Sequence, residues 1–216
     1  LFGTGPATVV PGGMHAFIKS SPEVEVADIE FLFRGTAANA DVWFPGIKKK
    51  FEDGYSIGAS IVHPKTRGEV LLRSTDPREP LIMDFRFLSE EDDLILLRKA
   101  LKIARATANQ DALKPFRGVE LTPGPDVQSD ADIDEFIRNN VLTIEHPACT
   151  CPMGTGPGAV LDPDFRVKGV ERLRVVDGSA LPDLTSAHIN STILMMAEKA
   201  SDLIRGKELL PPEYVN

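Results

Sequence analysis

Long apolar runs and an excess of basic residues are missing from this sequence, and cysteines are rare. No stretch approaches the ~18 consecutive apolar residues that a membrane-spanning helix needs, so no membrane span is predicted. Only two of the 216 residues are cysteines, which excludes a disulfide-stapled scaffold. The 24 Lys and Arg residues are outnumbered by 32 Asp and Glu, giving a formal net charge of −8. Nucleic-acid binding, which depends on basic side chains that contact phosphates, is therefore not expected.

The sequence also lacks the low hydrophobicity of a disordered chain, because 42% of its residues are hydrophobic and 26% are charged. This length and composition suffice for a hydrophobic core, in one large domain or two modest ones. The first six residues contain neither an initiator Met nor the basic-then-apolar pattern of a signal peptide. We expect them to come from the middle of a longer polypeptide.

The first part of the chain, to about residue 88, has short apolar runs separated by Gly and Pro, a pattern typical of strands. Over residues 24–33 apolar and acidic residues alternate with a period of two, as in a half-buried strand. Two further apolar runs, 55–62 and 69–73, flank a short connector that contains a Pro and ends in a Gly. This connector predicts that the two runs pair as an antiparallel hairpin.

Three helices are predicted after the strand-like part. Ser89 starts the first, because its hydroxyl can cap a helix and the three acids that follow suit the positive helix end. Ser129, which also precedes acidic residues, starts the second. The third runs from about Asn190 to Arg205 and stops at Gly206. The spacing of apolar residues predicts that this last helix turns a common face inward, formed by Ile193, Met196, Ala197, Ala200 and Leu203 or Ile204.

Two of the four histidines lie in segments that could carry chemistry. His146 begins the loop-forming segment His-Pro-Ala-Cys-Thr-Cys-Pro-Met-Gly, and His188 lies at the start of the last predicted helix. A neutral imidazole near pH 7 is what a general base requires, although residue type alone leaves a structural role open. Cys149 and Cys151 lack the Cys-x2–4-Cys spacing of a metal site, and no second ligand cluster accompanies them. No metal is predicted.

Five segments, in the same order along the chain, carry a resemblance to one enzyme family. Residues 146–154 are similar to His-Pro-x-Gly-Thr-Cys-x-Met-Gly, and residues 160–179 match Val-Asp-x-x-x-Arg-Val-x-Gly-Val-x-x-Leu-Arg-Val-Val-Asp-Ala/Gly-Ser almost throughout. Residues 64–70, 116–124 and 197–204 fit as well. These motifs are those of the glucose–methanol–choline (GMC) family of FAD-dependent oxidoreductases. The resemblance covers nearly the entire chain.

The resemblance implies two catalytic residues. In the family, the first His of the motif and a His or Asn about forty residues later face the reactive N5 edge of the flavin. His146 and His188 take these positions here, with Asn190 as the alternative if the alignment slips by two residues. One imidazole would accept the hydroxyl proton of an alcohol while the other holds the oxygen by a hydrogen bond, and the resemblance does not assign which does which.

The resemblance also implies the residues that contact FAD, the cofactor it predicts. Asp177 and Gly178 are expected beside FAD through their backbone amides, and a glycine lets the chain approach a ligand closely. Ile189 is expected to offer its backbone N–H to the flavin pyrimidine ring, next to His188. Cys149 departs from the family, which usually has Gly there, and we interpret both thiols as small buried hydrophobic groups.

The Gly-x-Gly-x-x-Gly turn that receives the FAD pyrophosphate in this family is missing from the chain. We therefore expect an N-terminal FAD-binding portion as a partner. The predicted fold is α+β, with a substrate-binding domain over residues 1–150 built on an antiparallel sheet backed by helices. Residues 151–216 are predicted to be the C-terminal piece of an FAD-binding α/β domain.

The resemblance implies that an alcohol transfers a hydride from its carbon to flavin N5, and that dioxygen or a quinone then accepts the electrons. One alternative is a hydroxynitrile lyase-type enzyme, which keeps the flavin but uses the same histidines for acid–base cleavage without net redox. A second alternative is a stable fragment without catalytic activity.

Overall fold

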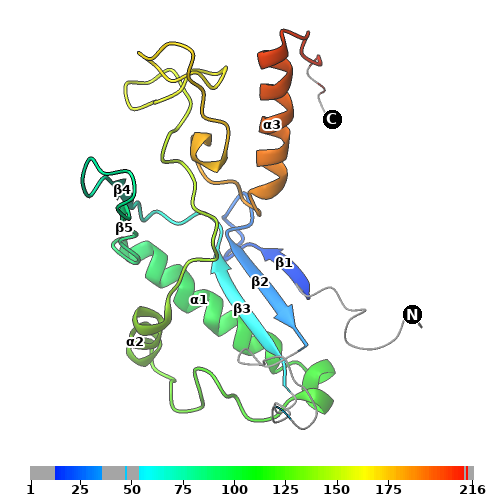
Figure 1. The fold of residues 1–216 in the computed structure, drawn as a ribbon. Coiled ribbons are helices and arrows are strands. Elements are labelled where there is room, and N and C mark those ends of the chain that lie inside the picture. The colour runs from blue at the N-terminus through cyan, green and yellow to red at the C-terminus, as the bar shows by residue number, and fades with distance from the viewer. Residues whose placement is uncertain (1–12, 36–46, 48–53, 212, 214–216) are drawn as a thin grey trace. The chain divides into compact units, whose positions relative to one another are not determined.

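The computed structural model describes residues 13–35, 47, 54–211 and 213. The chain divides into two compact units, Leu1–Arg67 with Arg86–Leu142, and Gly68–Phe85 with Thr143–Asn216. Figure 1 follows them from the blue N-terminal strands to the red C-terminal helix. Antiparallel sheets and helices occur together, which confirms the predicted α+β class. The division at residue 150 into a substrate-binding and an FAD-binding part stays a prediction.

The first unit contains a three-stranded antiparallel sheet of β1 (Met14–Ile18), β2 (Ile29–Arg34) and β3 (Ser56–Ile61), in that order. The predicted strand over residues 24–33 is confirmed only from Ile29 onward. The strand-like pattern of the first 88 residues also covers 1–12, 36–46 and 48–53, which lie outside the described residues. Burial of β2 against the first helix explains its apolar alternation.

Helix α1 (Glu91–Ala108) covers one face of this sheet, as Figure 1 shows. Ile29 and Phe31 alternate onto that face because successive strand side chains point to opposite sides, and they pack with Ala100 of α1. Their side chains are 0% and 7% exposed, so they form the centre of the sheet–helix core.

The start of α1 differs from the sequence-based prediction. The N-cap residue is Glu90, not Ser89, and its side chain makes no cap hydrogen bond. The acids that follow have another role, because the buried carboxylate of Asp93 accepts the backbone N–H groups of Lys65 and Thr66, each at 2.8 Å. The start of the helix is thus fixed to the connector that follows β3, and the Ser-plus-acids pattern correctly predicted a helix but not its cap.

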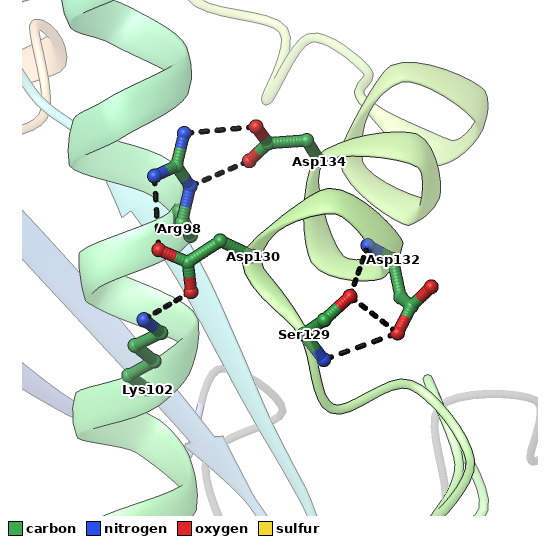
Figure 2. A network of polar contacts seen from close by, with 6 residues as sticks. All are labelled: Arg98, Lys102, Ser129, Asp130, Asp132 and Asp134. Carbon is green, nitrogen blue, oxygen red and sulfur yellow. Dashed lines mark hydrogen bonds and ion pairs between the residues drawn. The ribbon is translucent and has the colours of Figure 1, made fainter.

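Helix α2 (Asp130–Asn140) begins as the sequence predicts, and the 3-10 helix η2 (Asp111–Phe116) precedes it. The Ser129 hydroxyl accepts the backbone N–H of Asp132 at 3.1 Å, and the Asp132 carboxylate accepts the backbone N–H of Ser129 at 3.1 Å. This reciprocal capping box is drawn in Figure 2. The apolar face of α2 packs against α1 through Ile133, Ile137 and Leu94.

Polar side chains also join α1 to α2 (Figure 2). The Arg98 guanidinium donates from Nε and Nη2 to the two carboxylate oxygens of Asp134, at 2.6 and 2.8 Å. Asp130 lies between Arg98 and Lys102 and accepts from both. The Lys102 ammonium holds the pKa of Asp130 below its ordinary value, first through this hydrogen bond and then through its charge.

The second unit contains a two-stranded antiparallel sheet, β4 (Glu69–Leu71) with β5 (Ile82–Asp84). The predicted hairpin between residues 55–62 and 69–73 is therefore wrong, although both segments contain strands. β3 pairs with β2 instead, and the connector after β3 gives its amides to a helix carboxylate rather than forming a tight reversal. Apolar alternation identifies strands, but it does not say which strands pair.

Helix α3 (Asn190–Arg205) ends the second unit with the bounds that the sequence predicts, and Gly206 closes it in the left-handed conformation at φ +65°. It packs with the 3-10 helix η3 (Gly178–Ala180) in one core. This core consists of Leu161, Phe165, Ala180, Leu181, Ile189, Met196 and Ala200. Of the residues predicted to point inward, Ala197 is exposed, and of the two alternatives Leu203 and Ile204 it is Leu203 that packs against the core. None of the helices in the described ranges has the length and hydropathy to cross a bilayer.

Candidate active site

The segment that begins with His146 is tied to η3 by a short ladder of backbone hydrogen bonds. The N–H groups of Cys149, Cys151 and Met153 donate to the carbonyls of Gly178, Ser179 and Ala180, at 3.2, 2.9 and 3.0 Å. The three donors are alternate residues of the segment, and the three acceptors are the consecutive residues of η3. The ladder fixes the two family-like motifs side by side.

Gly178 lies where these motifs meet α3. A Cβ added to it would lie 3.3 Å from Ile193 Cδ1, and 3.5 Å from both Ile189 Cδ1 and the carbonyl oxygen of Pro147. The missing side chain thus lets η3, the Pro147 segment and the first turn of α3 pack closely. The contact of Gly178 with a ligand stays a prediction, and protein atoms line the space that a Cβ would need.

His146 and His188 lie together in the second unit, although about forty residues separate them in the sequence. Their ring centroids are 4.8 Å apart, and the ring planes make an angle of 73°, so the rings meet edge to face. The His146 residue is half-buried and His188 is exposed. Asn190, the alternative to His188, is the exposed first residue of α3. The two imidazoles are close enough to contact the same small molecule.

Asp177 uses its carboxylate within its own turn. One oxygen accepts the backbone N–H of Ser179 at 2.8 Å and also the Ser179 hydroxyl, which caps η3. This carboxylate is therefore engaged in holding the turn. A contact of Asp177 and Gly178 with a cofactor would accordingly use the backbone, as the sequence analysis expects.

The N-terminus of α3 provides hydrogen-bond donors of another kind. Its N-cap residue, Ile189, makes no side-chain cap hydrogen bond, and the first turn contains no acidic residue. The first N–H groups of a helix have no acceptor within the helix and carry partial positive charge. An electron-rich acceptor suits such an end, and the carbonyl oxygens of a flavin pyrimidine ring are of this type. This donor set fits FAD at the place where the sequence analysis puts Ile189.

Cys149 has a backbone conformation that the sequence analysis did not anticipate. Its φ is +68°, in the left-handed region that side chains disfavour. The residue is partly buried and packs against the core of the second unit, beside Ala148 and Cys151. The family's usual Gly at this position was the signal that could have predicted the left-handed conformation, because glycine adopts it readily.

Comparisons with known proteins agree with the motifs. The family model described as GMC oxidoreductase matches residues 64–197. The chain is 42% identical over 195 residues to oxygen-dependent choline dehydrogenase from Pseudomonas aeruginosa strain UCBPP-PA14, an alignment that covers 90% of this chain and 34% of that protein. It is 39% identical over 203 residues to the enzyme of the same name from Staphylococcus xylosus, covering 93% and 36%. The chain belongs to the GMC oxidoreductase family.

A solved structure supports the same assignment. Pyridoxine 4-oxidase from Mesorbium loti superposes with a TM-score of 0.74 at 29% sequence identity, covering 90% of this chain and 38% of that one. Membership of the GMC family indicates FAD as the cofactor, as the sequence predicted. The chain spans only about a third of the length of the curated relatives it matches.

Proposed function

We propose that this chain forms the C-terminal part of an FAD-dependent alcohol oxidoreductase in which His146 and His188 are the acid–base pair. The observation that supports this most directly is the edge-to-face approach of the two rings, with centroids 4.8 Å apart. Two imidazoles at this separation can reach one hydroxyl group from two directions. FAD, when bound, supplies the two-electron acceptor for the hydride of the alcohol carbon.

The two rings divide the work on the substrate oxygen. One imidazole nitrogen, in its unprotonated form, accepts the hydroxyl proton, while the N–H of the other ring donates a hydrogen bond to the same oxygen. His146 is the more enclosed of the two, and its loop is fixed by the ladder to η3, so we assign it the base. His188 then orients the alcohol oxygen.

The backbone holds the cofactor in this proposal. The N-terminus of α3, at Ile189, would hold the pyrimidine ring of the flavin through backbone N–H groups, because the partial positive charge of a helix end suits an electron-rich acceptor. Asp177 and Gly178 contribute backbone amides nearby. The remaining FAD contacts come from an N-terminal FAD-binding portion, since the curated relatives are about three times as long as the matched region.

The proposed substrate is a small, non-phosphorylated alcohol, with dioxygen or a quinone as electron acceptor. The names of the relatives mention choline and pyridoxine, and the names of both enzymes point to alcohol oxidation. A steady-state panel of alcohols with both acceptors, measured on the FAD-loaded enzyme, identifies the preferred pair.

The histidine assignment is tested by anaerobic reduction of the bound flavin, followed by its visible absorbance. We expect His146→Ala and His188→Ala each to slow reduction by about tenfold or more, because a positioned acid or base contributes roughly 10²–10⁴-fold. FAD content should not change, since the proposed cofactor contacts are backbone groups. His63→Ala, in the connector after β3, is the matched control and should reduce its flavin at the wild-type rate.

Two results would contradict the proposal. Wild-type reduction rates in both histidine variants would remove the pair from the chemistry. A flavin that no alcohol bleaches, in an enzyme that cleaves a cyanohydrin, would establish the lyase alternative instead.

A further inference from the structure

The three-stranded sheet of the first unit has one face against α1 and a second face of different character. Ile29 and Phe31 of β2 pack with α1, so Glu30, which lies between them, points to the other side. Residues that are paired across an antiparallel sheet share a face. By this register, the second face of the sheet consists of His15, Phe17, Glu30, Leu32, Gly58 and Ser60.

Glu30 is an acidic residue buried within the second face. It is only 3% exposed. Its carboxylate oxygen Oε1 lies 2.6 Å from Nδ1 of His15, whose side chain is 33% exposed. Burying a carboxylate costs free energy that an apolar residue would not, and paired groups of this kind cluster at functional sites. The histidine pair of the proposed mechanism makes no use of Glu30 or His15.

The contact with Glu30 determines which nitrogen of His15 can meet a ligand. An ionised carboxylate only accepts hydrogen bonds, so the Nδ1–H of His15 donates to it. In the neutral ring the acceptor is then Nε2. A buried carboxylate that holds an imidazole in one tautomer is a common arrangement where the ring must present its other nitrogen to a substrate.

The second face also has a glycine that packing does not require. A Cβ added to Gly58 would make only ordinary contacts, the nearest 3.8 Å from the carbonyl oxygen of Leu32. Glycine weakens the interior of a strand and often marks a place where a ligand approaches the backbone. Gly58 is exposed, and Phe17, which is paired with Glu30, is 40% exposed and offers an apolar contact.

We propose that His15 binds the part of the alcohol away from its reacting hydroxyl, by accepting a hydrogen bond at Nε2, and that Glu30 is the positioning residue that holds the ring. The inference rests on the proposed function and names its substrate class, an alcohol that carries a second hydrogen-bond donor such as another hydroxyl. The predicted substrate-binding part is built on this sheet, and α1 already fills the other face. A site that bonds a substrate hydroxyl strongly rejects an analogue without it.

The test compares alcohols of equal size with and without the second hydroxyl. Ethylene glycol and n-propanol form one such pair, and p-hydroxybenzyl alcohol and p-methylbenzyl alcohol form another. On the FAD-loaded enzyme, we expect kcat/KM to favour the hydroxylated member of at least one pair by about tenfold or more. His15→Ala should abolish this preference by raising KM for the hydroxylated alcohol, with kcat/KM for its methyl partner and FAD content unchanged.

Two variants and a control separate the roles of the pair. Glu30→Gln keeps the size of the side chain but no longer enforces one tautomer, because an amide also donates, so part of the preference should be lost. The double variant His15→Phe/Glu30→Leu replaces both partners by apolar groups, avoids an unpaired buried carboxylate, and should lose the whole preference. Met14→Ala, at an exposed neighbouring position of β1 that points to the other face, should keep the wild-type preference.

Equal kcat/KM values within both pairs, in an enzyme that oxidises alcohols, would overturn the assignment of His15 and leave the proposed function intact. An equal loss for both members of a pair in the His15 variants would overturn it as well, because it would show a general effect on the fold. A wild-type enzyme whose flavin no alcohol reduces would instead refute the proposed function.

Discussion

The backbone at Cys149 predicts that substitution by glycine has opposite effects on stability at positions 149 and 148. Cys149 has a φ of +68°, whereas Ala148 is not among the residues with positive φ. Glycine at position 149 removes the clash between Cβ and the carbonyl oxygen that a left-handed residue suffers. Glycine at position 148 brings no such relief and only makes the unfolded chain more flexible.

The magnitude follows from the two opposing contributions. The left-handed conformation costs a residue with a Cβ roughly 1–2 kcal/mol, and glycine costs about 0.5–1 kcal/mol in backbone entropy relative to alanine. Cys149→Gly should therefore be more stable than Cys149→Ala by about 0.5–1 kcal/mol. Ala148→Gly should be less stable than the wild type by about the same amount. Comparing Gly with Ala at both positions cancels the loss of the partly buried Cys149 thiol.

Thermal unfolding of the purified variants is the assay. For a chain of this size, a change of 1 kcal/mol shifts the midpoint by about 2–4 °C. We expect Gly to raise the midpoint relative to Ala at position 149 and to lower it at position 148. A lower midpoint for Gly at both positions would show that the left-handed backbone of Cys149 does not strain the protein, and the explanation for the family's glycine would fail.

Two further predictions concern α1 and α2. A double-mutant cycle of Arg98→Ala and Asp134→Ala, measured by urea unfolding, should give a favourable coupling free energy, because the two side chains share two charge-assisted hydrogen bonds. A coupling free energy that does not decrease in 1 M NaCl would contradict an ionic origin. The hydrogen bond from the Ser129 hydroxyl lowers the pKa of Asp132. The capping box therefore stabilises the protein above about pH 4, and this stabilisation is lost as the pH falls through the lowered pKa. Ser129→Ala should therefore flatten the fall in thermal midpoint between pH 5 and pH 2, and an unchanged slope would exclude the capping box as its source.

Local signals in the sequence predicted the helices well because helix ends are determined by nearby residues. Ser129 and Asp132 form the capping box within four residues, and Gly206 stops α3 through its own backbone. Even the less accurate prediction at Ser89 gave the right helix, with its start displaced to Glu91. The predicted role of the acids was incomplete there, because Asp93 accepts a hydrogen bond from a connector more than twenty residues away in the sequence.

Strand pairing could not be predicted in the same way, because the partner of a strand depends on distant parts of the chain. The segments 55–62 and 69–73 both contain strands, but β3 pairs with β2 and β4 pairs with β5. A Pro and a Gly in the connector are compatible with a tight turn without requiring one. The sequence contained no signal for the capture of this connector by a buried carboxylate.

The residues of the candidate site came from the family motifs rather than from composition. Residue type left His146 and His188 open to structural roles, and only the motif spacing selected them. The structure then places their ring centroids 4.8 Å apart. The contact of Gly178 with FAD stays a prediction, because a glycine that packing requires and one that ligand binding requires look alike in a sequence.

The one wrong prediction on the inward face of α3 follows from the geometry of a helix. Apolar spacing placed Ala197 on the inward face with Met196 and Ala200, but successive helix residues are turned by about 100°, and Ala197 is exposed. Leu203 packs against the core, while Ile204, the other alternative at the end of the face, is 60% exposed. The side of α3 that faces the core could therefore be predicted from spacing, whereas the edges of that side depend on what packs beside the helix.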